Sequence, residues 1–239
     1  VAVEGFDRVR RMTGKDLPQL NMYWQTGGDT TETIYCTEEG FTAGICQPAD
    51  SIQIQGKDED RDEYDDCVIL RQIYKFVERK ISASDNPGGA NDGRREDARH
   101  AWSEGMATFF SSHTRGSPIF VDRNRVGAYK VRDLEHEDSP FSFGTADGTM
   151  AGDVSPYLVA AFLWDLVDGT EDDAVVANPS GVYDAAFNYL SRRDVGMRGH
   201  PGGRDLVDFL DGWFYLWHGQ TAEIRGLLRE RDFPYDFSG

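Results

Sequence analysis

The chain has 239 residues, of which 39% are hydrophobic and 12% are aromatic. A chain of this length can bury a sizeable core as one domain, and its aromatic content argues against intrinsic disorder. The formal net charge of −17 disfavours nucleic acid and anionic membrane surfaces as partners. The sequence also holds no apolar stretch of the length that a transmembrane span needs, so no membrane insertion is expected.

The N-terminal region predicts a short helix over residues 4–13 and then a small β-sheet. Three segments are predicted as strands: LNMYWQ, ETIYCTE and SIQIQG. Apolar and polar residues alternate in the first of them and, strictly, in the last. The first residues, VAVEGFDRVRR, lack the features of a signal peptide and begin as though inside a domain. We therefore expect the chain to be part of a longer, exported multidomain protein.

Three cysteines bear on the compartment. Cys36 and Cys46 flank the segment TEEGFTAGI, which could fold as a hairpin closed by a disulfide, although two free thiols would have the same spacing. Cys67 lies among apolar residues and is expected to be a buried thiol. A local disulfide favours an oxidising environment, so we expect a secreted, periplasmic or cell-surface location.

An acidic run from Lys57 to Asp66 precedes the first long helix. Asp58, Asp60 and Asp62 alternate as in a calcium-binding EF-hand loop, but no Gly stands at the sixth position and Ile69 replaces the Glu of the twelfth. We therefore reject an EF-hand. Helix capping and the helix dipole explain the acidic residues instead.

The helix predicted from Tyr64 to Ile81 is apolar over more than half of its circumference and is expected to be largely buried. Arg71, Lys75 and Glu78 share the remaining stripe at positions i, i+4 and i+7, so either cation could pair with Glu78. A long loop rich in Gly, Pro and Asn follows over residues 82–97. Loops of this length in compact domains are often functional.

A second helix is predicted from about Asp97 to Ser112, and it places His100 and Glu104 one turn apart. A His/Glu pair at this spacing can supply two metal ligands. A third ligand would have to come from His113, His136 or an aspartate, none of which has motif spacing. A hydrogen-bonded histidine on the helix surface is the simpler interpretation.

The remaining sequence predicts two strands and a mainly helical part. The fold class is therefore α+β, as one domain over residues 1–239 with a small N-terminal sheet followed by helices. Residues 1–60 are expected to be mostly strands, residues 61–112 to hold the two central helices, and residues 113–239 to form a mainly helical subdomain.

Several segments resemble bacterial zinc metallopeptidases of the gluzincin type. They are residues 65–81, the SASDNPGG loop, AWSEGMATFF, VAAFLWDLVDG and, more loosely, FLDGWF. In that family the first helix carries His-Glu-x-x-His, and the Ser-Glu-Gly helix supplies the third zinc ligand. The resemblance covers most of the chain after residue 50 and implies a zincin-like fold.

At the zinc-binding positions the chain departs from this family. Arg71 and Lys75 stand where the two histidines would be, Gln72 stands where the catalytic glutamate would be, and Glu104 keeps its type. Guanidinium and ammonium groups offer no lone pair to a metal, and an amide cannot take a proton from a zinc-bound water. The degenerate motif Arg71-Gln72-Ile73-Tyr74-Lys75 therefore predicts a pseudopeptidase without zinc. The resemblance makes Tyr157 a candidate for the hydroxyl that gluzincins often use to stabilise the transition state, but a core tyrosine at the start of a helix is the simpler interpretation.

Without a metal, a buried Glu104 would need a compensating charge. We predict an ion cluster of Arg71, Lys75 and Glu104 in place of the metal site, against the alternative that Arg71 and Lys75 lie on a solvated helix face. If the cleft binds a partner, these cations would attract a peptide or protein with acidic groups.

Two other hypotheses stay open from the sequence. One is an active metal-dependent peptidase with zinc relocated to His100 and Glu104, and the other is a structural domain whose cleft has no role.

Overall fold

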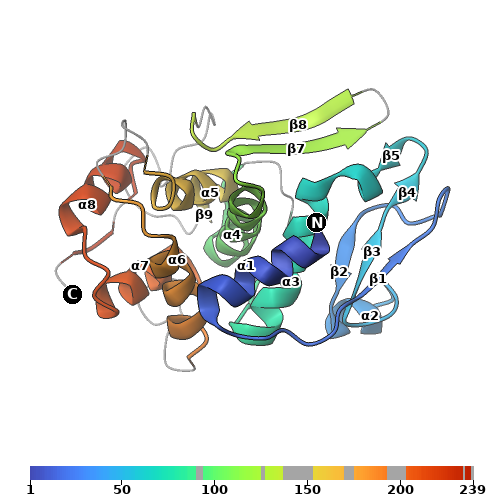
Figure 1. Ribbon diagram of the computed structural model, residues 1–239, viewed down its shortest axis with the longest axis horizontal. Coiled ribbons are helices and arrows are strands. Elements are labelled where there is room, and N and C mark those ends of the chain that lie inside the picture. Colours follow the sequence, from blue (N-terminus) through green and yellow to red (C-terminus); the bar gives the residue numbers. More distant parts are fainter. Residues whose placement is uncertain are drawn as a thin grey trace.

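The computed structural model describes residues 1–89, 94–124, 127–136, 153–169, 175–192, 203–233 and 235–237. The fold is α+β, with a small N-terminal sheet at one end of the molecule and helices over the remainder (Figure 1). Two long helices, α3 (Asp66–Ile81) and α4 (Ala98–Arg115), lie between these parts. None of the helices in the described ranges combines the length and hydropathy needed to cross a bilayer.

The N-terminal sheet has three strands in the order β1, β3, β2, close to the three predicted segments. Their bounds are Asn21–Trp24 for β1, Ile34–Cys36 for β2 and Ser51–Ile54 for β3. Strand β1 runs parallel to β3, whereas β2 is antiparallel to it. Helix α1 (Ala2–Thr13) precedes the sheet, so the first 60 residues contain helix as well as strand.

Cys36 and Cys46 form a disulfide with a Sγ–Sγ distance of 2.06 Å. The segment between them is a short helix, α2 (Glu38–Thr42), and the predicted hairpin is wrong. Thr37 explains the difference, since its hydroxyl accepts a hydrogen bond from the Gly40 amide at 3.0 Å and caps the helix. Glu38 and Glu39 in the first turn also favour helix through the dipole.

Helix α3 follows two short strands, β4 (Gly56–Lys57) and β5 (Asp60–Arg61), and a 3₁₀ turn, η1 (Asp62–Tyr64). The expected capping of α3 does not occur at Asp65, whose side chain makes no hydrogen bond to the helix. Its carboxylate instead accepts a hydrogen bond from the Arg123 backbone amide at 2.6 Å. Tertiary contact with a later strand therefore replaces the capping that local sequence predicted.

Helix α4 is the central element and is buried along most of its length. Helix α5 (Pro156–Asp165) packs directly against it at Gly105. A Cβ atom at Gly105 would lie 2.6 Å from the Pro156 carbonyl oxygen and 2.6 Å from the Val159 Cβ atom. The glycine of the Ser-Glu-Gly sequence is therefore required by close helix packing.

The other elements are two pairs of strands and the helices that follow α5. Strands β7 (Ile119–Asn124) and β8 (Gly127–Asp133) are the two strands predicted after α4 and pair antiparallel, and β6 (Glu96–Asp97) pairs with β9 (Asp153–Val154). The helical elements are α6 (Pro179–Asp184), which continues into the π-helical turn η2 (Ala185–Tyr189), then α7 (Leu206–Tyr215) and α8 (Thr221–Glu230).

Candidate functional site

Arg71, Lys75 and Glu104 form the predicted ion cluster between α3 and α4. The Arg71 guanidinium donates to Oε2 of Glu104, and Nζ of Lys75 lies 2.6 Å from Oε1. The Glu104 side chain is 4% exposed and that of Arg71 is 10% exposed, so the alternative of a solvated helix face is wrong for Arg71. The Lys75 side chain is 26% exposed and links the cluster to solvent.

The charge of Glu104 is stabilised by its two partners. Burial by itself raises the pKa of this carboxyl, but the Lys75 ammonium and the Arg71 guanidinium outweigh burial and lower the pKa to about 2. Glu104 is therefore ionised at neutral pH. Each of its carboxylate oxygens has a cationic partner.

Gln72, at the position of the catalytic base in the resembled family, holds α3 to the sheet. Its Oε1 atom accepts a hydrogen bond from the Tyr35 backbone amide in β2 at 2.9 Å, and the side chain is buried. This contact satisfies a backbone donor at the outer edge of β2. Gln72 therefore has a structural partner, and sequence spacing alone gave no signal of it.

Glu78 is a second buried carboxyl one turn along α3 from Lys75. Ser103 of α4 donates to its Oε2 atom at 2.7 Å, and the Tyr74 hydroxyl lies 3.4 Å from Oε1. Burial raises the pKa of Glu78 to about 7, although the hydrogen bonds from Ser103 and Ser84 oppose this shift. Both cations lie within ion-pair distance of Glu104, so the alternative in which one of them pairs with Glu78 is not the one observed, and hydroxyl groups contact Glu78 instead.

The substitution Glu78→Gln is expected to stabilise the protein above pH 7 by up to about 3 kcal/mol. The folded carboxyl keeps its proton to about pH 7, whereas an unfolded one ionises near 4.5. Stability of the wild type therefore falls as pH rises through that window, and glutamine removes this fall. Urea unfolding of both proteins at pH 4 and pH 8 measures the difference. An equal effect of the substitution at the two pH values would contradict the assignment.

His100 is one turn from Glu104 but lies in the interior, 2% exposed, so the predicted surface position is wrong. Its Nδ1 atom lies 2.9 Å from Oδ1 of Asn86, in the loop between α3 and β6. The backbone of Gly89 in the same loop packs against the ring edge that carries Nε2. The loop therefore covers His100, which explains why a polar helix position is buried.

The residues considered as a third metal ligand have other partners. Nδ1 of His113 lies 3.0 Å from the Tyr183 hydroxyl, and burial, followed by the nearby Arg8 charge, lowers the pKa of His113 to about 4. His136 is exposed, and its Nδ1 atom lies 3.4 Å from Oδ2 of Asp133.

Tyr157 is 1% exposed, as expected for a core residue. The Arg132 guanidinium lies over its ring, 4.5 Å from the ring centre.

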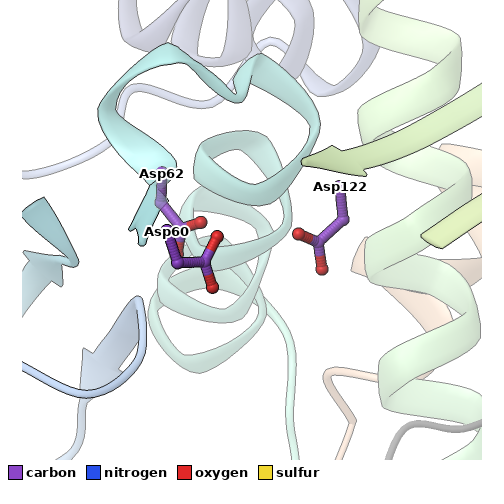
Figure 2. Close-up of side chains that lie close together, drawn as sticks. All are labelled: Asp60, Asp62 and Asp122. Carbon is purple, nitrogen blue, oxygen red and sulfur yellow. The ribbon is translucent and has the colours of Figure 1, made fainter. Parts of the chain in front are cut away.

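Within the described ranges, one set of three side chains brings possible metal ligand atoms together, and it includes neither His100 nor Glu104. It consists of Asp60, Asp62 and Asp122, whose ligand atoms lie within 4.8 Å of one another. Figure 2 shows Asp122 of β7 facing Asp60 of β5 and Asp62, the first residue of η1. Asp122 is about 60 positions away in sequence, so the acidic run alone could not reveal this group.

Three carboxylates at this distance repel one another unless a proton or a cation intervenes. Burial raises the pKa of Asp62 to about 7, with a smaller contribution from the charges of Asp60 and Asp122, while a hydrogen bond from Thr33 opposes the shift. Protonation of Asp62 therefore relieves the repulsion near neutral pH. Carboxylate oxygens are also the ligands that hard cations prefer.

Comparison with known proteins adds no family assignment. Neither the protein-family models nor the curated proteins include a match to this chain.

Proposed function

We propose that this chain is a catalytically inactive, zinc-metallopeptidase-like module that serves in binding or in the structure of an exported protein. The observation that carries the proposal is that Arg71 and Lys75 both bond to Glu104. These are the three positions at which the resembled family would hold zinc.

The geometry argues against zinc at this place for an electrostatic reason. A zinc ion beside Glu104 would lie next to two cationic side chains, neither of which can act as a ligand. Peptide hydrolysis also needs a base for the attacking water, and the amide of Gln72 is bonded to the Tyr35 backbone. The ion cluster and the bonded amide thus each favour an inactive module.

The relocated site at His100 and Glu104 receives no comparable support. Glu104 has a cationic partner on each oxygen, and His100 contacts Asn86 through Nδ1. Binding of a metal by Glu104 would require its bonds to Arg71 and Lys75 to break, and the Nε2 edge of His100, which a metal would have to reach, packs against the backbone of Gly89. We therefore prefer the inactive module to an active peptidase.

Lys75 is the member of the cluster that a partner can reach, since about a quarter of its side chain is exposed. The ligand class that we propose for the exposed part of Lys75 is a peptide or protein segment with acidic groups. The Cys36–Cys46 disulfide supports an oxidising compartment, and we propose a secreted or cell-surface location.

The test is the metal content of the purified, unchelated protein by mass spectrometry, with a peptidase assay in the presence of added zinc. We expect no stoichiometric zinc and no cleavage that a chelator abolishes. One zinc per chain together with chelator-sensitive cleavage would overturn the proposal. His100→Ala would then distinguish a relocated site, because the substitution would remove the zinc.

A further inference from the structure

An aromatic pocket lies far from the ion cluster, between the end of α7 and residues 235–237. Its volume is about 560 Å³, and its walls include six aromatic residues and two aspartates. The aromatic residues are Tyr189, Phe214, Tyr215, Trp217, Tyr235 and Phe237. Helix α7 and the C-terminus lie at the end of the molecule away from the N-terminal sheet (Figure 1).

Trp217 is the most unusual residue of the aromatic pocket. It is 92% exposed, so both faces of its indole ring are open to a ligand. Its backbone φ of 62° lies in the left-handed region, which a bulky side chain rarely adopts. Exposure of a large apolar ring and a strained backbone both cost stability. A tryptophan at such a position is better explained by binding than by folding.

The aromatic rings around this pocket already contact cations of the chain itself. The Arg192 guanidinium lies 5.3 Å from the ring centre of Tyr189 and 5.0 Å from that of Tyr215. The Arg225 guanidinium lies 4.5 Å from the ring centre of Phe237. The negative faces of these rings are therefore placed to attract positive charge.

Two carboxylates of the pocket also favour a positively charged ligand. Asp211 and Asp236 line the pocket, and the walls that the described residues form contain no lysine or arginine. The Tyr235 hydroxyl donates to Oδ1 of Asp211 at 2.6 Å, which holds this carboxylate at the wall. A carboxylate has about four lone-pair positions, so it can accept several hydrogen bonds at once. The net charge of −17 further favours a cation over an anion.

We propose that the aromatic pocket binds an organic cation of the alkylammonium or guanidinium class. The cation lies against the indole ring of Trp217, and its charge is balanced by Asp211 and Asp236. This is the combination of aromatic faces and carboxylates that stabilises a cation bearing alkyl groups. The proposal is independent of the inactive peptidase-like site.

The experiment titrates the full chain with choline, followed by tryptophan fluorescence and calorimetry at constant ionic strength. The matched neutral ligand is 3,3-dimethyl-1-butanol, which has the shape of choline without its charge. We expect choline to bind with a dissociation constant on the order of 1 mM. The neutral ligand should bind about tenfold more weakly.

Two variants locate the site. Trp217→Ala should weaken choline binding about tenfold, and Asp211→Asn should weaken it without removing a ring. Trp24→Ala is the matched control, because Trp24 is 51% exposed on β1 and belongs to the opposite end of the fold. Trp217→Gly should retain or raise the melting temperature, since glycine adopts a positive φ without strain.

Three outcomes would overturn the proposal. Equal binding of choline and the neutral ligand would mean that the pocket recognises shape and not charge. Unchanged choline binding in Trp217→Ala would place the cation elsewhere on this acidic chain. Binding of a neutral oligosaccharide such as maltotetraose, with none of choline, would make the aromatic pocket a sugar site.

Discussion

Replacing Glu104 with glutamine is expected to lower the free energy of unfolding by about 3–5 kcal/mol near pH 7. The amide keeps the shape of the side chain but leaves the Arg71 guanidinium, 10% exposed, without its counter-charge. The lowered pKa of Glu104 gives a similar magnitude, because a shift from 4.5 to about 2 corresponds to about 3 kcal/mol. Urea unfolding of the variant and the wild type at pH 7 measures this loss.

The pH dependence of this loss has a definite sign. The folded pKa of Glu104 lies below the value for an unfolded glutamate, so its contribution is fully present above about pH 4.5. The contribution disappears as pH falls toward 2, where the wild type and Glu104→Gln should have similar stability. A difference that persists unchanged at the lower pH would contradict the role of the charge.

A matched control replaces the whole cluster. The triple variant Arg71→Met, Lys75→Met and Glu104→Met removes all three charges and keeps similar side-chain volumes. Buried ion clusters replaced in this way often lose little stability or gain some. We therefore expect the triple variant to be more stable than Glu104→Gln. If Glu104→Gln lowered the free energy of unfolding by less than about 0.5 kcal/mol, the charge of Glu104 would not be energetically coupled to Arg71 and Lys75.

The ion cluster itself could be predicted from the sequence. Arg71 and Lys75 are four residues apart and so share one helix face, and Glu104 lies in a helix too apolar to be exposed. A buried carboxylate needs a cationic partner. The resemblance to metallopeptidases placed Arg71 and Lys75 opposite Glu104, so these two residues were the expected partners. The disulfide and the three N-terminal strands could also be predicted, because each depends on residues close together in the sequence.

Other features depend on contacts that sequence spacing does not encode. The Gln72 side chain bonds a backbone amide in β2, and Asp65 bonds the backbone of Arg123 in β7. His100 is buried because the loop that precedes α4 covers it, and Asp122 joins the acidic run only through the fold. In each case a tertiary partner overrides a local preference. The Cys36–Cys46 segment is the exception, since its Thr37 cap was a local signal for helix.

Substituting three residues is expected to give this chain a zinc site. The triple variant Arg71→His, Gln72→Glu and Lys75→His places the His-Glu-x-x-His sequence on α3. The side chains at positions 71 and 75 already converge on Glu104, so two imidazoles there would face a third ligand. We expect one zinc per chain with a dissociation constant on the order of 1 μM or tighter, whereas the wild type should hold none. Mass spectrometry under native conditions and a competition titration measure both quantities.

The fourth substitution, Glu104→Gln, tests which residues hold the zinc. If Glu104 is the third ligand, adding this change to the triple variant should weaken zinc binding by about 10- to 100-fold, a loss of the size that disruption of a zinc site causes. Unchanged affinity would place the third ligand elsewhere. A folded triple variant that binds no zinc would show that α3 and α4 do not form a metallopeptidase-like frame. In that case the cluster of Arg71, Lys75 and Glu104 would be a structural ion cluster with no relation to a metal site.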